Sequence, residues 1–102
     1  MNKLKSTQRS FLRSQAHHLE PVVLIGKNGL TDGTIEAVNK ALDARELIKI
    51  KFREFKDNKQ SISDEIAVSA NCHVVGIIGH TVILFRQNSD PEKQNIRLPG
   101  IK

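Results

Sequence analysis

Alternating apolar and polar residues are clearest between positions 47 and 52. Ile48, Ile50 and Phe52 alternate with Lys49 and Lys51, and a period of two predicts a strand with one buried face. Residues 22–25 form a short apolar run rich in β-branched side chains, which favours a second, buried strand. Residues 74–86 hold two more apolar runs, divided by a glycine and a histidine, and these predict a closing β-hairpin.

Three other segments repeat their apolar residues at helical spacing. The first helix is predicted over residues 6–18, and the second ends near Arg45 after an N-cap at Thr31 or Asp32. Ser61 with Asp64 resembles a capping box, so a third helix is expected to begin there. The predicted order is αβαβαββ, which indicates an α/β fold: a single-domain sandwich on a mixed four-stranded sheet.

The C-terminal segment differs from the rest of the chain. From Gln87 onward the sequence is polar and contains Pro91 and Pro99, with few residues that could pack. We therefore assign residues 1–86 to the domain and residues 87–102 to a polar tail that can add a short edge strand.

The charge of the chain is unevenly distributed. Sixteen Lys and Arg residues outnumber eleven Asp and Glu residues, for a net charge of +5. Residues 1–31 hold five of the bases against Glu20 as the single acid, and Lys5, Arg9 and Arg13 recur in steps of four along the first predicted helix. A local cationic face points to a polyphosphate partner, nucleic acid before membrane. On charge alone, a solvated basic surface explains the pattern equally well.

Several classes of function lack the residues they need. The sequence has neither a Walker A loop nor a dinucleotide fingerprint, and its His and Cys residues do not have paired metal-ligand spacing. Convergent carboxylates for a nuclease are also missing. We therefore expect no catalysis, no cofactor and no metal. Cys72 is the single cysteine, and it is more simply a small core thiol than a nucleophile.

The same sequence gives an expectation for the compartment. The longest apolar runs have four residues, against about 20 for a membrane span. Arg9 and Arg13 interrupt any apolar region that could act as a secretory signal. A lone cysteine excludes an intrachain disulfide. We expect a cytoplasmic protein without a membrane partner.

A glycine loop, Gly26-Lys27-Asn28-Gly29, separates the run at 22–25 from the second helix. A G-x-x-G turn lets backbone N–H groups approach a phosphate, and Lys27 adds a full charge. KH-type loops hold single-stranded nucleic acid in this way. Taken alone, however, glycines also simply end strands.

The outer face of the strand at 47–52 could enlarge this surface. Lys49, Lys51 and Arg53 share that face, and they are most simply its solvated side. If the face adjoins the glycine loop, the three side chains also contribute to nucleic-acid binding.

Several segments together carry a resemblance to a known family. They are Leu12-Arg13, Ala16-His17, Leu19, Pro21-Val22, Ile25 to Thr31, Glu46 to Ile50, Val75 to Gly79 and Val82 to Arg86. Over residues 4–86 the chain resembles the CRM domain, in particular the YhbY-like stand-alone bacterial proteins. The resemblance implies a fold similar to the C-terminal domain of translation initiation factor three, and RNA binding linked to maturation of the large ribosomal subunit.

Carried over by position, the resemblance places RNA contacts at Gly26–Gly29 and on the basic first helix, which includes Arg13. Phe85 stands where the family commonly has Tyr, so a role for a phenolic hydroxyl is not expected here. Because aromatic residues are only 4% of the chain, we expect backbone contacts to dominate and base stacking to be minor.

We predict a monomeric RNA-binding protein whose partner is ribosomal RNA in precursor large subunits. Two rivals stay open. One is an RNA-binding factor with another task such as group II intron splicing, which related domains perform in plant organelles. The other is a protein-interaction adaptor that uses a sheet edge or the tail.

Overall fold

The computed structural model describes residues 4–96 and residue 98. Its elements follow the predicted order, with two short 3₁₀ turns added. They are α1 (Ser6–Ala16), β1 (Pro21–Ile25), α2 (Asp32–Arg45), β2 (Leu47–Phe52), η1 (Lys56–Asn58), α3 (Lys59–Ser69), β3 (His73–Ile78), β4 (Thr81–Phe85) and η2 (Pro91–Lys93). The α/β class and the mixed four-stranded sheet are therefore confirmed.

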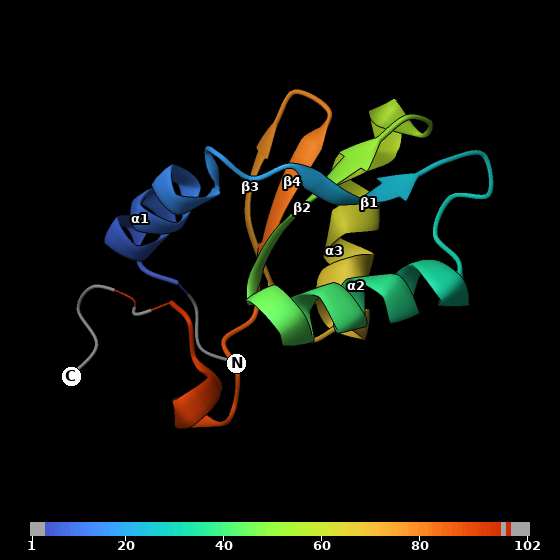
Figure 1. Cartoon of the computed structure of the whole chain (residues 1–102). Helices are drawn as coiled ribbons and strands as arrows, with labels where there is room; N and C mark the ends of the chain where they lie inside the picture. Colours follow the sequence, from blue (N-terminus) through green and yellow to red (C-terminus); the bar gives the residue numbers. More distant parts are fainter. Residues whose placement is uncertain (1–3, 97, 99–102) are drawn as a thin grey trace.

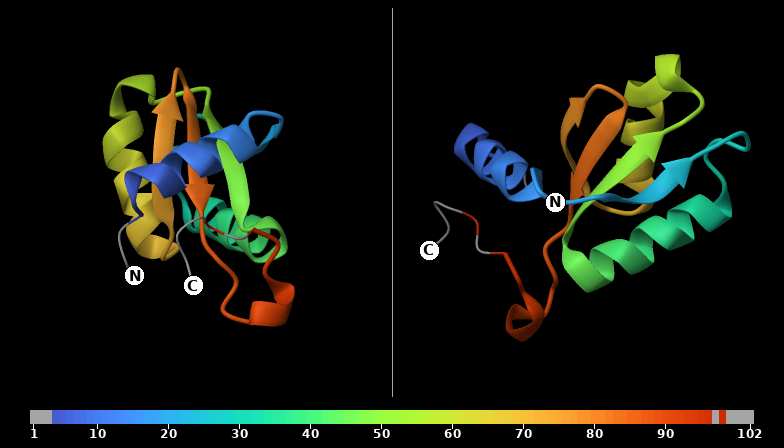
Figure 2. Two further views of the ribbon diagram at one scale, coloured as in Figure 1. Left: turned by 90° about the vertical axis from the view of Figure 1, so that its left-hand side faces the viewer. Right: turned by 45° about the horizontal axis from the view of Figure 1, so that its top comes forward.

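The four strands lie in the order β1-β2-β4-β3. β1 pairs parallel to β2, which α2 makes possible as the crossover helix, whereas β4 pairs antiparallel with both β2 and β3. The helices lie in two layers: α1 on one side of the sheet, α2 and α3 on the other (Figure 1). Figure 2 (left) shows α1 running across the strands.

Each face of the sheet packs its own apolar cluster, because side chains alternate along every strand. The larger cluster joins the sheet to α2 and α3, and its members include Ile25, Ile50, Phe52 and Ile66. The smaller one joins the sheet to α1, through Leu12 and Phe85 among others. In β2 the alternation places Ile48, Ile50 and Phe52 on the larger cluster, as their period predicted.

One predicted helix start agrees with the structure and another differs from it. Thr31 is the N-cap of α2 as predicted, but α3 begins at Lys59 and not at Ser61. The polar residues before it already turn as a 3₁₀ helix, so Ser61 lies inside α3 and its hydroxyl donates to the Asn58 carbonyl at 3.1 Å. The capping-box interpretation of Ser61 and Asp64 was therefore wrong.

The tail packs against the domain on the α1 side of the sheet. Within residues 87–96 and 98 the structure has the 3₁₀ turn η2 and no strand, so the edge strand is not formed there. Leu98 is 9% exposed and joins the smaller cluster with Ile96 beside it. The division into residues 1–86 and a tail from 87 to 102 stays a prediction.

A buried carboxylate fixes the tail in place. Glu46, 1% exposed, follows α2 in a left-handed backbone conformation with φ 63°. Its Oε1 accepts hydrogen bonds from the N–H groups of Asn95 and Ile96, at 2.6 and 3.0 Å, and its Oε2 accepts from the N–H of Asn88 at 2.5 Å. These charge-assisted bonds satisfy both oxygens of a group that would otherwise be costly to bury.

Candidate nucleic-acid interface

The glycine loop forms a tight turn at the end of β1. The N–H of Gly29 donates to the carbonyl of Gly26 at 3.0 Å, which closes the turn around Lys27 and Asn28. Both central residues are exposed. Among the described residues, none accepts a hydrogen bond from their backbone N–H groups. Two amides without an acceptor in the described part of the chain and one ammonium group therefore belong to the same exposed turn, an arrangement suited to an anion.

The two glycines of the turn have different constraints. Gly29 has φ +64°, and a Cβ there would lie 3.1 Å from Cε2 of Phe55, so neither the backbone nor the space suits a side chain. Gly26 has an ordinary φ, and a Cβ there would meet nothing within 4 Å. Gly29 is thus required by the fold, whereas the space above Gly26 is open to a ligand.

The start of α2 holds the second half of the turn. Thr31 Oγ1 accepts from the N–H of Thr34 at 3.2 Å, and the Thr34 hydroxyl donates to the carbonyl of Gly29 at 3.4 Å. The helix start is therefore capped by its own side chains, so the turn offers a ligand chiefly the amides of Lys27 and Asn28.

Backbone contacts bring two other segments beside the turn. The N–H groups of Arg53 and Glu54 donate to the carbonyl of Ile25 at 2.9 and 3.2 Å, and the N–H of Phe52 donates to the carbonyl of His80 at 2.8 Å. Lys59 Nζ donates to the carbonyl of Gly79. Residues 26–29, 53–59 and 79–80 consequently share one end of the sheet, which we call the loop end.

The loop end carries a net positive charge, because its basic residues outnumber its acidic ones: Lys27, Arg53, Lys56 and Lys59 against Glu54 and Asp57. The pKa of His80 is lowered from its usual 6.5, first by desolvation and then by the positive charges of Lys59, Lys56 and Lys51, while Asp57 opposes them. The side chain itself is exposed. A phosphate placed here would meet several cations at once.

A groove continues from the loop end across the sheet toward α1. It measures about 490 Å³, and Arg13, His17, Leu19, Glu20, Pro21, Lys49, Lys51, Ile78, Thr81 and Ile83 line it. Lys51 is exposed and pairs with Leu24 of β1, one residue before the end of that strand. The outer face of β2 therefore extends to the strand end that precedes the loop, and its contribution to nucleic-acid binding stays a prediction.

The lysines of β2 are not equivalent. Lys49 is partly buried, and its Nζ donates to the carbonyl of Leu19 at 3.0 Å, which ties β2 to the segment after α1. Lys51 and Arg53 are exposed, and Arg53 stands at the loop end. Of the three predicted side chains, Lys51 and Arg53 are free to contact a ligand, whereas Lys49 already has a structural partner.

The basic residues at the start of α1 and along it lie progressively farther from the turn. Arg13 lies over β3, where a Cβ on Gly76 would come within 3.0 Å of Arg13 Nε. His73 begins β3, at the opposite end of that strand from the loop end; burial lowers its pKa most, and the positive charge of Arg9 lowers it further. Lys5 immediately precedes α1 and is exposed. In Figure 1 the loop after β1 and helix α1 lie on opposite sides of the molecule. The structure thus places Arg13 in the groove, and Lys5 and Arg9 beyond it.

Sequence reasoning missed Phe55, Lys56, Lys59 and His80 at the loop end. They are more than twenty residues from the glycine loop along the chain, and no local pattern links them to it. The tertiary pairing of β2 with β1 and β4 brings them together.

Two residues quoted for the family resemblance serve the core. Phe85 is 1% exposed, and its ring stacks on that of His73 at a centroid distance of 6.4 Å. Arg86 donates to Asn39 Oδ1 at 2.7 Å, to the carbonyl of Ala70 at 2.5 Å and to Asp43 Oδ1 at 2.8 Å. These bonds join β4 to both α2 and α3, so Arg86 holds the fold together.

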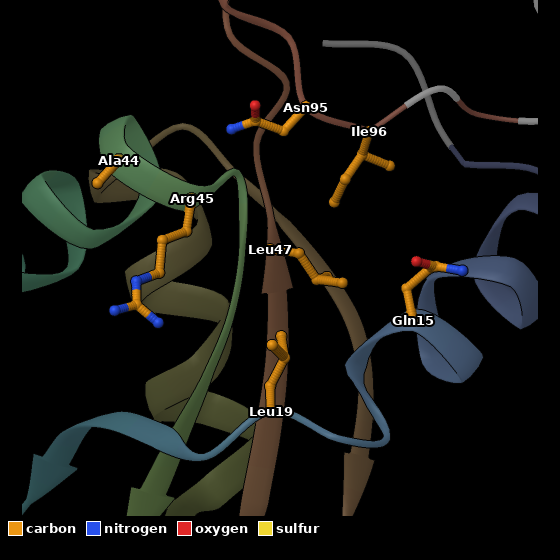
Figure 3. A pocket seen from close by; sticks show the side chains of 7 residues that line it. All are labelled: Gln15, Leu19, Ala44, Arg45, Leu47, Asn95 and Ile96. Atoms are coloured by element: carbon orange, nitrogen blue, oxygen red, sulfur yellow. The ribbon is translucent and has the colours of Figure 1, made fainter.

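A second cleft lies at the other end of β2, between α1, α2 and the tail. It measures about 360 Å³, and Gln15, Leu19, Ala44, Arg45, Leu47, Asn95 and Ile96 line it. Figure 3 shows Leu19, Leu47 and Ile96 directed toward its middle, with Arg45 to one side. Among the described residues, Arg45 is the single charged residue that lines the cleft, whereas Arg13, Lys49 and Lys51 line the groove.

Within residues 4–96 and 98, no three His, Cys, Asp or Glu side chains form a group that could hold a metal ion. Over the same described part of the chain, none of the helices is both long enough and apolar enough to cross a membrane.

Comparison with known proteins identifies relatives that match nearly the whole chain. The Bacillus subtilis "Probable RNA-binding protein YqeI" is 35% identical, covering 94% of this chain and 99% of its own length. An "RNA-binding protein" of Haemophilus influenzae is 39% identical, covering 97% of this chain and 98% of its own. The solution structure of a Staphylococcus aureus protein, described as a candidate RNA-binding protein, covers 95% of this chain and 100% of its own with a TM-score of 0.79 and 28% identity. Residues 4–86 match the CRS1/YhbY (CRM) domain, and the chain therefore belongs to this family.

Proposed function

We propose that this protein binds RNA at the loop end and along the adjoining groove. The observation that carries the proposal is the turn at Gly26–Gly29, which presents two free amides and Lys27 to solvent. Relatives that match almost the full chain are named as RNA-binding proteins. Backbone amides and cations recognise phosphates without regard to base sequence, so the turn positions the RNA.

The RNA strand follows the cationic surface away from the turn. Lys51 and Arg13 line the groove that begins at the loop end. Lys5 and Arg9 add only weak attraction at long range. Salt screens charges that are farther apart than a Debye length of about 10 Å. Contacts close to the turn therefore carry more of the binding than the outer half of α1.

We infer that the RNA is ribosomal RNA in precursor large subunits, which the protein binds as a cytoplasmic monomer without catalysis. The family resemblance supports this partner, and it also supports the rival of intron splicing. Sedimenting a cell lysate through a gradient and probing the ribosomal fractions tests the choice. Recovery of the protein with precursor large subunits supports ribosome assembly. Its complete absence from them would contradict it.

The adaptor alternative also has a structural basis. The open half of the sheet beside the loop end exposes Leu24 by 49% and Ile78 by 61%. Apolar side chains on an uncovered sheet face are typical of a protein interface. An apolar interface responds weakly to ionic strength, whereas a phosphate contact weakens steeply, so salt dependence decides between the two.

Two substitutions in the turn test the phosphate contact directly. Lys27→Ala removes one charge and keeps the amides, so RNA binding should weaken by about 1 kcal/mol. Asn28→Asp is nearly isosteric but brings negative charge to the proposed phosphate position, so it should bind RNA several-fold more weakly than Lys27→Ala. Both variants should unfold at the temperature of the parent.

Lys40→Ala is the matched control, since the Lys40 side chain is 79% exposed on α2 and pairs with Glu36 on the same helix. It should retain the affinity of the parent. If both turn variants stay folded and bind RNA as the parent does, the turn only ends a strand, and α1 must carry the contact.

A further inference from the structure

An exposed aromatic ring stands beside the glycine turn. Phe55 is 43% exposed and has φ 57°, in the left-handed region that bulky residues seldom adopt. An aromatic side chain held at the surface by an unfavourable backbone needs an explanation, because such conformations persist only where the surroundings enforce them.

The surroundings fix Phe55 on both sides. The two residues before it donate their N–H groups to the carbonyl of Ile25, and the carbonyl of Phe55 accepts from the N–H of Asn58 at 2.9 Å. One side of the ring, formed by Cδ2, Cε2 and Cζ, lies over Gly29, where an added Cβ would be 3.1 Å from Cε2, closer than nearly all real Cβ contacts. The ring is therefore held against the turn while much of its surface stays in solvent.

The charges nearby favour a polyanion over an apolar partner. Lys27 lies in the turn, and Arg53 and Lys56 belong to the segment that carries Phe55; all three are exposed. Glu54 and Asp57 are the acidic residues of the same segment, and the net charge of these five side chains is positive. An aromatic face with a phosphate-binding turn beside it is the combination that single-stranded nucleic acids require, because each nucleotide has one base to stack and one phosphate to neutralise.

We propose that Phe55 is a stacking platform for one unpaired base of single-stranded RNA, whose neighbouring phosphate lies at Gly26–Gly29. This deepens the proposed function and rests on it. It also revises the expectation that base stacking is minor: the four Phe residues are few, but this one lies at the turn. Stacking tolerates any base, so the platform selects unpaired RNA and not a sequence.

The competing explanation is that the ring only covers Gly29. Phe55→Leu separates the two, since leucine keeps an apolar cover and loses the aromatic face. We expect Phe55→Leu to bind single-stranded oligoadenylate of about ten nucleotides roughly 5- to 10-fold more weakly. Its thermal unfolding and the salt dependence of binding should match the parent, because no charge changes.

The chain has no Trp and no Tyr, so Phe55→Trp introduces a unique fluorophore at the platform. Its emission should be quenched when oligoadenylate is added, but not when the same strand is supplied as a duplex. Val68→Trp is the control, because Val68 is 83% exposed near the far end of α3. Its emission should not change.

The outcomes separate the two levels of the proposal. Two results would refute the platform while the phosphate-binding turn stands. In one, the parent binds oligoadenylate but the emission of Phe55→Trp is not quenched at saturation; in the other, Phe55→Leu binds oligoadenylate as tightly as the parent. Equal quenching by the duplex also refutes it. If the parent binds no RNA at any ionic strength, the proposed function fails and the platform fails with it.

Discussion

Gly26 and Gly29 occupy the two ends of one turn, yet only Gly29 needs to be glycine for the fold. Its φ of +64° and its contact with Phe55 both oppose a side chain. Gly29→Ala should therefore lower the free energy of unfolding by about 1–2 kcal/mol. Gly26→Ala places a methyl group in open space and restricts the unfolded chain, so stability should stay level or rise by up to about 1 kcal/mol.

The two variants should rank in the opposite order for RNA affinity: Gly26→Ala should bind RNA more weakly than Gly29→Ala. A methyl group on Gly26 occupies the space that an approaching phosphate needs, so this variant should lose affinity while staying fully folded. Urea unfolding and RNA titration of the same samples give both quantities. Unchanged affinity in Gly26→Ala would mean that the RNA backbone does not approach that side of the turn.

Cys72 illustrates a residue whose role its surroundings decide. It is 3% exposed in the larger cluster, and burial raises the pKa of its thiol from 9.0 to about 11, against a smaller opposing effect of Arg86. Cys72→Ser should cost about 1–2 kcal/mol of stability by burying a hydroxyl, with RNA affinity unchanged. Loss of RNA binding in a folded Cys72→Ser variant would reverse this assignment.

The raised pKa also has a pH consequence. Between pH 9 and about 11 the thiol ionises in the unfolded chain but not in the folded one, so stability contributed by Cys72 is present below pH 9 and is lost as pH rises through this range. The parent should therefore lose more stability than Cys72→Ser over that interval. Thiol labelling of the folded parent at neutral pH should be slow, because the thiolate is the reactive form.

At the scale of the element, local periodicity determined how much could be predicted. β2 was predicted with both boundaries correct, because apolar and polar residues alternate without interruption over residues 48–52. The start of α3 was predicted two residues too late. Ser61 and Asp64 have the spacing of a capping box, but the polar residues before them form a 3₁₀ turn that leads directly into the helix. The role of Glu46 could not be predicted at all, since its partners are 42 to 50 residues further along the chain.

Glu46 makes the attachment of the tail testable. Glu46→Gln keeps one oxygen for Asn95 and Ile96 but turns an amide donor toward the N–H of Asn88, so a buried donor loses its acceptor. We expect a loss of about 2–3 kcal/mol in the free energy of unfolding, and faster protease cleavage within residues 87–96. Glu54→Gln, at an exposed position, should match the parent. A Glu46→Gln variant as stable as the parent would show that the tail is held by other contacts.

At the scale of the whole molecule, the candidate site is a product of the topology. Sequence reasoning predicted the turn, because a glycine loop between a strand and a helix is a local signal, and Arg13, because basic residues recur in steps of four along the first helix. It did not identify Phe55, Lys59 or His80, since their neighbours in space belong to other strands. The parallel pairing of β1 with β2 places the segment after β2 beside the turn, and such long-range pairing has no signature in local spacing.

Salt dependence tests the site as a whole. If the turn, the groove and the loop end together contact about four to six phosphates, log K against log salt should have a slope near −3 to −5. Lys51→Ala should bring that slope closer to zero by about 1, because an exposed ammonium that contacts one phosphate is lost. Lys49→Ala should leave the slope nearly unchanged and lower stability instead, because Lys49 Nζ is bonded to the carbonyl of Leu19. Filter binding at several salt concentrations, with urea unfolding of each variant, measures both effects. A parent slope near zero would contradict RNA binding and favour the adaptor, since an apolar interface at Leu24 and Ile78 releases no counterions.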